Sequence, residues 1–509
     1  MLLKWSYMTH FNRFITIFAC FAILVSCGCE KKRVLPEVDP PEFQRYCQDL
    51  VLSSKTLGVS VKYSVYYPAS YMTDKDKRYP VVYMLHGIGD DNNSWNGNYL
   101  HANNKVDTWT AKGLGEMIYV FPQGYSSYYC NRYDGTFSYM DMFVNELIPT
   151  IDSSLRTIPD KQHRAITGYS MGGFGAIALA EKHPELFIAC APLSMSVRTD
   201  WQYKEESQDG WNNQWGKIFG GYGQAGDARI TDYYKQHCPL YFFNAENKEA
   251  LSTVHWYLIC GDNEENLLYS NDELHCVLMD NGYEHEYRVV DGGHSSSVWM
   301  PALDEVLPMF DHYMNNGSLW APTEEAAPAS TALKTEDDGA YLSPAYKEKG
   351  TGTAMFIVHD NLADDALMAV MATVQGRSST SAYALLPCDI SKKPLSDWMS
   401  QWEVAHPCQK RFVLGVESGA AAALTLPSDT FSRSFYINPA VGSKFNVAAD
   451  QEIFFAGTDV DANYWDMDKL YCACKKNKAS FEYRIVNGNS SHIHNLEKSL
   501  ESIKYSITF

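Results

Sequence analysis

The sequence predicts an α/β protein, in which a mostly parallel sheet flanked by helices is followed by a shorter second copy of the same pattern. Three observations predict it: apolar segments alternate with helical segments, a stretch rich in Ala, Pro, Ser and Thr interrupts the chain, and the first pattern then begins again. A chain of 509 residues also exceeds one ordinary domain, so two domains are expected.

The strands of the first copy are predicted from short runs that end in Gly or a polar residue. The run VSVKYSVYY alternates polar and apolar side chains, which indicates a half-buried strand, whereas runs such as YPVVYML favour a buried one. Helices are predicted between several strands, for example over 140–155 and 271–282. The predicted strands cover residues 59–67, 79–87, 116–124, 163–170, 186–195, 254–262 and 283–294.

The second copy is recognised by comparison within the chain. Residues 257–293 align without gaps on a segment 196 positions later, which pairs Gly261 with Gly457 and Arg288 with Arg484. The low-complexity stretch between the copies is typical of a linker. We therefore predict one domain over residues 46–316, a linker over 317–348 and a second, trimmed domain over 349–509.

The N-terminus indicates export. A basic start precedes an apolar run from Phe14 to Val25, which is too short to cross a bilayer and typical of a signal peptide. The run leads into LVSC, which resembles a bacterial lipoprotein box. The resemblance implies that residues 1–26 are removed, that Cys27 is lipidated, and that 27–45 form a tether. We expect an exported protein held to a membrane only by lipid, in the periplasm or at the cell surface.

Composition excludes some functions. A formal net charge of −19 and the lack of a basic stripe argue against binding to nucleic acid. The 13 cysteines show no metal-ligand spacing and assign no disulfide. Aromatic residues make up 14% of the chain, which suits sugar rings or aromatic acids as ligands, although most of them will be core.

A nucleophile is predicted at Ser170. The motif Gly168-Tyr169-Ser170-Met171-Gly172 follows a predicted strand and opens a helix, which is the setting of a nucleophile elbow. Small residues are required there because the strand and helix backbones approach closely. Alone, a G-x-S-x-G motif is weak, but this context favours a nucleophile over a chance turn.

A base and an acid are expected to follow in that order along the fold's late loops. His294 fits the base, because it ends YRVVDGGH, where two glycines let the loop curl back over the serine. The acid is expected in the loop after residues 254–260. Glu264 is preferred, Asp262 is the alternative, and a solvated acidic loop is a third interpretation.

Acyl transfer also needs hydrogen-bond donors for the oxyanion. The backbone amide of Met171, at the start of the predicted helix, is one candidate. The segment His86-Gly87-Ile88-Gly89 follows an early strand and supplies the second candidate, the amide of Ile88. This chemistry requires neither a metal nor a cofactor.

Four stretches together resemble the putative-esterase branch of the α/β-hydrolases: YPVVYMLHGIGDDNNSW, GYSMGGFGAIALAEKHPELF, WGKIFG and GGHSSSVWMPAL. That branch includes feruloyl esterases and acetyl-xylan esterases of carbohydrate esterase family 1. The resemblance covers roughly residues 50–315. It implies an α/β-hydrolase fold and carboxylic-ester hydrolysis with Ser170 as nucleophile and His294 as base. The family usually has Asp as the acid, so Glu264 is a departure.

The second copy lacks this triad. A gapless alignment places Glu417, Ser490 and Val460 where the first copy has Ser170, His294 and Glu264. The nearby His492 and His494 are interpreted as loop residues, because no further metal ligands are identified. We therefore predict a non-catalytic pseudoenzyme domain, which could hold polysaccharide, cap the active-site mouth or pair with the first domain.

The resulting hypothesis is an exported serine esterase that removes feruloyl or acetyl groups from plant polysaccharide or oligosaccharide. A siderophore esterase or an acyltransferase on the same fold is the alternative enzyme, and a glycan-binding lipoprotein with a vestigial triad is the alternative of another class. Aromatic residues in predicted loops are candidates to line the substrate cleft, although core packing is the commoner role for each. They are Trp95, Trp109, Tyr125 and Trp211, with Tyr128, Tyr129 and Trp201 as further members.

Overall fold

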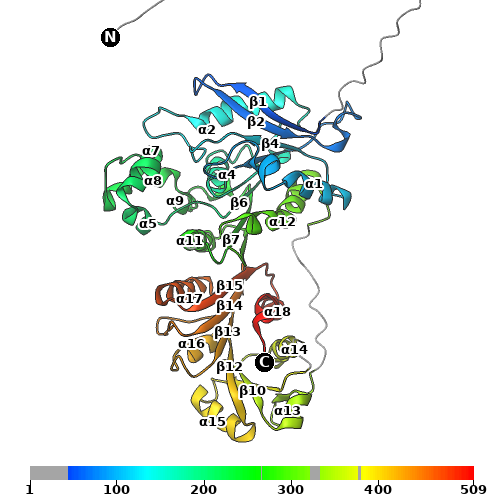
Figure 1. The fold of residues 1–509 in the computed structure, drawn as a ribbon, viewed down its shortest axis with the longest axis vertical. Coiled ribbons are helices and arrows are strands. Elements are labelled where there is room, and N and C mark those ends of the chain that lie inside the picture. The colour runs from blue at the N-terminus through cyan, green and yellow to red at the C-terminus, as the bar shows by residue number, and fades with distance from the viewer. Residues whose placement is uncertain (1–43, 265, 321–332, 377–379) are drawn as a thin grey trace, which may run out of the picture. The chain divides into compact units, whose positions relative to one another are not determined.

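The computed structural model describes residues 44–264, 266–320, 333–376 and 380–509. The predicted signal peptide, Cys27 and most of the predicted tether lie outside the described residues, as does the middle of the predicted linker. The described chain forms one 15-stranded sheet with helices on both sides (Figure 1). Each half of the sequence contributes one part of this sheet, and the predicted α/β class is confirmed.

The first half contributes eight strands in the order β1-β2-β4-β3-β5-β6-β7-β8. Strand β2 is antiparallel to both its neighbours, and the strands from β4 to β8 are parallel. Seven of them were predicted from the sequence, and β1 was not. Their bounds are β1 Tyr46–Ser53, β2 Ser60–Tyr66, β3 Val81–Leu85, β4 Ile118–Pro122, β5 Arg164–Tyr169, β6 Ala189–Leu193, β7 His255–Gly261 and β8 His285–Val290.

Two helices cover one face of these strands. Side chains of α1 and α12 form a single buried cluster with inward-facing residues of the strands, among them Val82, Ala165 and Ile259. Helix α4 packs on β5 and β6, directly after Ser170. The helices of this half are α1 Ala102–Ala111, α2 Tyr139–Met142, α3 Ile148–Ser154, α4 Met171–Lys182, α5 Asp200–Glu205, α6 Gln208–Gly210, α7 Gly216–Phe219, α8 Asp232–His237, α9 Pro239–Phe242, α10 Lys248–Leu251, α11 Asn266–Asp280 and α12 Ser296–Asn315.

The second half repeats this strand order without a counterpart of β1. Its order is β9-β11-β10-β12-β13-β14-β15, with β9 antiparallel to β11 and all other pairs parallel. The strands are β9 Tyr341–Leu342, β10 Gly352–His359, β11 Tyr383–Asp389, β12 Cys408–Val416, β13 Arg433–Ile437, β14 Glu452–Thr458 and β15 Ser480–Val486.

Helices again cover both faces of the sheet. Helices α14 and α18 lie on one side of the second half's strands and α16 and α17 on the other (Figure 1). Side chains of α14 and α18 share a buried cluster with the strands, including Met355, Leu414 and Phe435. The helices are α13 Pro344–Lys349, α14 Asp364–Gln375, α15 Leu395–Ala405, α16 Gly419–Leu424, α17 Tyr464–Asn477 and α18 His492–Ile503.

The two halves are joined edge to edge by β8 and β15, which run antiparallel and pair at Val289 and Ile485. Two buried ion pairs flank this contact symmetrically. Arg288 bonds to Asp459 at 2.5 Å, and Arg484 bonds to Asp262 at 2.5 Å. The sequence comparison matched Arg288 with Arg484 but did not predict that each would reach into the other half.

The C-terminal part of the predicted linker is ordered structure. Residues 317–348 were assigned to a linker, but Tyr341 and Leu342 pair with β11, and α13 begins at Pro344. Tyr346 of α13 is buried, and its hydroxyl donates to Pro407 O at 2.6 Å. These contacts place residues 341–348 with the second domain.

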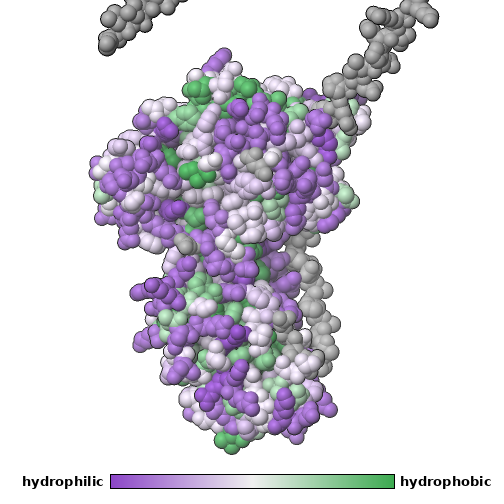
Figure 2. Space-filling model, in the orientation of Figure 1, coloured by the Kyte–Doolittle hydropathy of each residue, from purple (hydrophilic) through white to green (hydrophobic). Residues whose placement is uncertain are grey.

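The outer surface is mostly polar on the face shown in Figure 2, where hydrophobic residues appear in small separate groups. Within the described ranges, no helix has the length and apolar character needed to cross a bilayer.

Candidate active site

Ser170 occupies a sharp turn between β5 and α4. Its backbone has φ 58° and ψ −119°, a conformation that non-glycine residues rarely adopt and that is typical of a nucleophile elbow. The flanking glycines allow it. A Cβ on Gly168 would lie 2.4 Å from the Gly172 carbonyl oxygen, and one on Gly172 would lie 2.3 Å from that of Leu85. Since these clashes are with backbone, neither glycine can be replaced without moving the turn.

The structure brings Ser170, His294 and Glu264 into one hydrogen-bonded chain. His294 Nε2 lies 2.8 Å from Ser170 Oγ, and His294 Nδ1 lies 2.8 Å from Glu264 Oε2. A carboxylate accepts, so Nδ1 carries the proton that is donated to Glu264, and Nε2 is left to accept from the serine hydroxyl. The Glu264 side chain is fully buried, whereas that of His294 is 36% exposed and open to a ligand.

Glu264 is held by two further donors. The Ser194 hydroxyl donates to its Oε1 at 2.5 Å, and the Gly261 amide donates to the same oxygen at 2.7 Å. The indole N–H of Trp299 donates to Ser194 at 2.9 Å, and its ring lies edge-on to His294 at 5.1 Å. The carboxylate therefore has one orientation, with Oε2 directed at the imidazole.

Ser194 and Trp299 are site residues that the sequence analysis missed. Ser194 follows β6 outside any motif, and its positive φ of 46° is invisible in the sequence. Trp299 lies five positions after His294 within GGHSSSVWM. Its proximity to His294 in the chain was the one available signal.

Asp262, the alternative acid, points away from His294. Its Oδ2 accepts from Arg484, and its Oδ1 accepts from the Gly292 amide at 3.1 Å. Burial raises the pKa of this carboxyl, and the Arg484 guanidinium opposes the rise. Asp262 therefore connects Arg484, in the second half of the sheet, with Gly292, in the loop that bears His294.

The predicted oxyanion donors belong to two segments next to Ser170. Met171 is the first residue of α4, where backbone amides lack acceptors within the helix. The loop of Ile88 adjoins the elbow, since a Cβ on Gly87 would lie 3.5 Å from Ser170 Cβ.

His86 fixes the loop that carries Ile88. It is buried, its Nδ1 lies 2.7 Å from Gly87 O, and its Nε2 accepts from the Gly124 amide at 2.8 Å. Burial lowers its pKa, so the neutral ring serves as a structural brace. The site therefore has a base and an acid aligned with one hydroxyl, and the two candidate amides belong to segments that adjoin it.

Several of the predicted cleft residues are core instead. Trp95 is 1% exposed and donates to Leu85 O, and Trp211 is fully buried and donates to Gly221 O, so neither can contact a substrate. Trp109 belongs to α1 and not to a loop, and its indole donates to Asp304 of α12. Tyr125 keeps 37% exposure beside Phe137.

The further aromatic candidates divide in the same way. Tyr128 and Tyr129 are buried, and Trp201 is exposed on α5. The loops between strands are long enough to bury aromatic clusters of their own, which the sequence analysis did not foresee.

The second half has an elbow at the matching position. Glu417 has φ 51°, and its amide donates to Ile437 O at 3.0 Å, as the amide of Ser170 donates to Leu193 O at 2.9 Å. Its Oε1 lies 2.8 Å from His492 Nε2. His492 was interpreted as a loop residue, but it is the first residue of α18 and contacts the side chain of Glu417.

The gapless alignment was wrong about the acid position of this half. The amide of Asp262 donates to the carbonyl of Val290, the last residue of β8, and the amide of Asp459 donates in the same way to Val486, the last residue of β15. Asp459 is therefore the counterpart of Asp262, one residue later than the gapless alignment places it. Asp461, and not Val460, then corresponds to Glu264. Both carboxylates lie near a glycine at the end of the preceding strand: Gly261 is the last residue of β7, and Gly457 is the last but one of β14. A Cβ on Gly261 would be 3.1 Å from Glu264 Oε1, and one on Gly457 would be 3.4 Å from Asp461 Oδ2.

Across the described ranges, no group of three or more His, Cys, Asp or Glu side chains is arranged to hold a metal ion. The chemistry that the first site offers with its own residues is nucleophilic attack by a serine hydroxyl with proton transfer to a histidine.

Two curated relatives match part of the chain. An endo-1,4-beta-xylanase/feruloyl esterase of Xylanibacter ruminicola is 31% identical over 177 residues, which is 32% of this chain and 24% of that protein. An esterase of Mycobacterium tuberculosis is 29% identical over 154 residues, 29% of this chain and 32% of that one. The chain thus spans only a quarter to a third of the length of these relatives.

Among solved structures, a ferulic acid esterase is 29% identical and covers 53% of this chain and 100% of its own, with a TM-score of 0.45. An S-formylglutathione hydrolase of Staphylococcus aureus is 19% identical over the same shares, with a TM-score of 0.41. The family model described as "Putative esterase" matches residues 54–310, just over half of the 509. With the parallel sheet and the elbow, this match confirms the α/β-hydrolase class, and the chain belongs to the putative esterase family.

Proposed function

We propose that the protein is a serine carboxylic-ester hydrolase that uses Ser170, His294 and Glu264. The observation that carries this proposal is the continuous hydrogen-bonded chain from Ser170 Oγ through the imidazole to a buried carboxylate. A serine hydroxyl is a poor nucleophile until such a base accepts its proton. The membership of the esterase family supports the same reaction.

The proposed reaction has two halves. Ser170 Oγ bonds to the ester carbonyl carbon while its proton moves to His294 Nε2, and the Met171 and Ile88 amides stabilise the oxyanion. The imidazolium then donates that proton to the departing alcohol as the ester bond breaks. Water attacks the acyl-enzyme by the same route, which releases the acid and restores the serine. Glu264 holds the imidazole tautomer and stabilises its charged form.

The proposed substrates are feruloyl or acetyl esters on plant polysaccharide or oligosaccharide. The name of the Xylanibacter relative combines a xylanase with a feruloyl esterase, which supports this class. Two side chains beside the elbow are exposed, Ile88 at 49% and Tyr99 at 46%, and the Tyr99 hydroxyl lies 3.3 Å from that of Tyr169. An aromatic acyl group would find apolar contacts there.

We also propose that the mature protein is an exported lipoprotein attached through Cys27. The support is the sequence before it, an apolar run followed by LVSC. Metabolic labelling with an alkyne fatty acid tests it. We expect the wild type to carry label and to fractionate with membranes, and Cys27→Ala to carry none. Equal labelling of the two proteins would contradict the proposal.

Hydrolysis of two esters tests the enzymatic proposal. Wild type, Ser170→Ala and Glu417→Ser are assayed with methyl ferulate and with acetylated xylan. We expect the wild type to release ferulate or acetate and Ser170→Ala to lose at least about 10³-fold of the rate. If neither ester is cleaved, the polysaccharide esterase is excluded, and a siderophore esterase, an acyltransferase or a glycan-binding protein has to be considered.

A further inference from the structure

The elbow of the second half opens into a cavity of about 550 Å³, a size typical of small-molecule sites. Glu417, Asp461 and His492 line it at the carboxyl ends of parallel strands. In open α/β sheets ligands bind in this position. The first half uses the same position for Ser170, so the fold presents two comparable sites.

Eight of the ten residues that line this cavity are polar, and none of them is Lys or Arg. Two carboxylates, four asparagines, a serine and a histidine face it, with Val460 and Ala462 as the apolar members. Carboxylates accept, histidine can donate, and asparagine does both. An anionic ligand would meet carboxylates without a cationic partner, whereas sugar hydroxyls both donate and accept and match the mixture.

One buried side chain in this cavity, Asp461, has a polar atom without a partner among the described residues. Asp461 is 6% exposed, its Oδ1 accepts from the Asn463 amide at 2.9 Å, and its Oδ2 has no hydrogen-bond partner among the described residues. Asn438 is 5% exposed, and its Oδ1 accepts from Ser499 at 2.6 Å. A buried oxygen without a donor, such as Asp461 Oδ2, costs free energy unless a ligand or water satisfies it.

Comparison with the first half explains why Asp461 Oδ2 lacks a donor. There Glu264 accepts from His294 with one oxygen and from Ser194 with the other, so both of its oxygens have donors. Asp461 is one methylene shorter than Glu264, and Asn438 stands where Ser194 does, since both have positive φ and an amide bonded to the next strand. Burial raises the pKa of Asp461 to about 6, as expected for a carboxyl without a strong donor.

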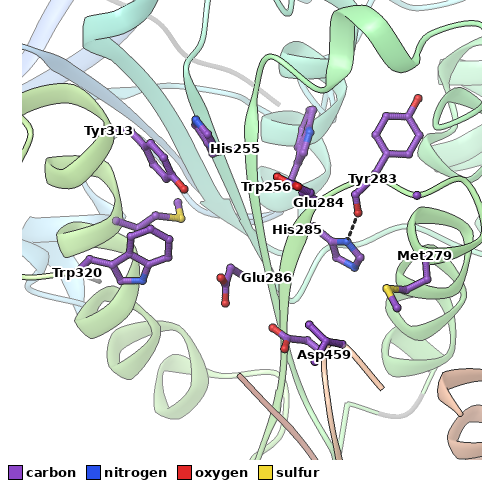
Figure 3. Close-up of a pocket in the computed structure, with 13 residues that line it drawn as sticks. His255, Trp256, Met279, Tyr283, Glu284, His285, Glu286, Tyr313, Trp320 and Asp459 are labelled. Carbon is purple, nitrogen blue, oxygen red and sulfur yellow. Dashed lines mark hydrogen bonds between the residues drawn. The ribbon is translucent and has the colours of Figure 1, made fainter. Parts of the chain in front are cut away.

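A second cavity, of about 570 Å³, adjoins the first at Val460. Figure 3 shows His255, Tyr313 and Trp320 grouped on one side of the strands and Met279 and His285 on the other. Tyr313 and Trp320 are partly exposed, with ring centres 5.5 Å apart. Aromatic rings offer flat apolar surfaces to the faces of sugar rings.

We propose that the second half binds a neutral oligosaccharide, with sugar hydroxyls bonded to Asp461, Asn438 and Glu417 in the cavity of about 550 Å³. The occupant is a chain of uncharged sugars, which would hold the protein on the polymer while the first half acts on ester groups. This site does not depend on esterase activity, because its residues are separate from Ser170 and His294.

Calorimetric titration of the full chain with ester-free xylohexaose, cellohexaose and mannohexaose tests the proposal. We expect at least one of them to bind saturably to the wild type and to Ser170→Ala alike. Asp461→Ala should weaken that affinity at least about tenfold, because it removes a buried acceptor. Ala462→Trp should do the same by filling the cavity from an exposed position without breaking a buried hydrogen bond.

The matched control is Glu501→Gln, which removes a carboxylate on the same helix as His492 but outside the cavity and should bind as the wild type does. The proposal is overturned if none of the three hexasaccharides binds, or if Asp461→Ala and Ala462→Trp both bind like the wild type. Binding of spermidine without any hexasaccharide would make this a cation site and would also overturn it. Ester hydrolysis by the wild type is recorded separately, so failure of one function leaves the other measurable.

Discussion

Arg484→Met is the perturbation that best tests how the two halves are joined. The Arg484 side chain is 7% exposed and that of Asp262 is 1% exposed, so both charges are buried. Removal of the cation leaves the carboxylate without its counter-charge, which costs about 3–5 kcal/mol when a buried pair is broken. An exposed pair is worth about 0–1 kcal/mol, which sets the scale for a control.

Urea unfolding at pH 7.5, followed by circular dichroism, measures this cost. Arg411→Met is the control, because its partner is Glu403 and the Arg411 side chain is 44% exposed. Adding Asp262→Asn to Arg484→Met should recover most of the lost stability, since the amide oxygen can still accept from Gly292 and no charge is left buried. The rate of ester hydrolysis should fall about tenfold or more in Arg484→Met, because the loop of His294 loses its anchor.

The loss should also depend on pH. Burial places the pKa of Asp262 above its unfolded value, and loss of Arg484 leaves the Gly292 and Tyr483 amides to oppose that rise. The folded variant then binds a proton that the unfolded chain does not, so its stability falls as pH rises above the unfolded pKa of about 3.9. The deficit relative to wild type should therefore shrink as pH falls. If Arg484→Met costs less than about 1 kcal/mol, as Arg411→Met should, the joint is not what we describe.

Three further outcomes follow from the site contacts. Glu264→Gln should lower kcat about 10³- to 10⁴-fold, because the amide no longer stabilises the charged imidazole. Asp262→Asn should lower kcat less than about tenfold. Similar losses of kcat in the two variants would mean that the acid is misassigned. Trp299→Phe removes the hydrogen-bond donor to Ser194 and should lower the free energy of unfolding in urea by about 1 kcal/mol. The fall in kcat should be smaller than that of Glu264→Gln. If neither stability nor kcat changes, Trp299 does not position the site. Burial raises the pKa of Asp461 to about 6, so the contribution of this carboxyl to folding stability falls as pH rises from about 4 to about 6. Asp461→Asn should therefore raise the free energy of unfolding by about 2–3 kcal/mol at pH 7 and leave it unchanged at about pH 4. Equal effects at the two pH values would contradict the assignment.

Much of the first half could be predicted because its signals are local. The elbow at Ser170 requires glycines at fixed positions, and the loop of His294 requires Gly292, so both residues are visible in short stretches. The parallel strands are buried on both faces and appear as apolar runs. These features depend on neighbours in the chain and not on distant contacts.

The sequence favoured Glu264 as the acid but left Asp262 open as the alternative. Both belong to one short loop, and what separates them is Arg484, which lies more than 200 positions away. Trp95 and Trp211 were misjudged for a related reason, because long inter-strand segments fold back and bury their own aromatic side chains. The shift that makes Asp461 the counterpart of Glu264 arises because Thr458 and Val486 are one residue closer in the chain than the equivalent pair, Gly261 and Val290, which a gapless alignment conceals.

The most direct test of the central claim is covalent labelling of Ser170 by a fluorophosphonate, measured by mass spectrometry of the intact protein and of its tryptic peptides. We predict one adduct per chain, located on the peptide that begins at Ala165 and ends at Lys182, with labelling abolished in Ser170→Ala and slowed in Glu264→Gln. An intact wild type that takes up no label, or a label on another residue, would contradict the assignment of Ser170 as the nucleophile.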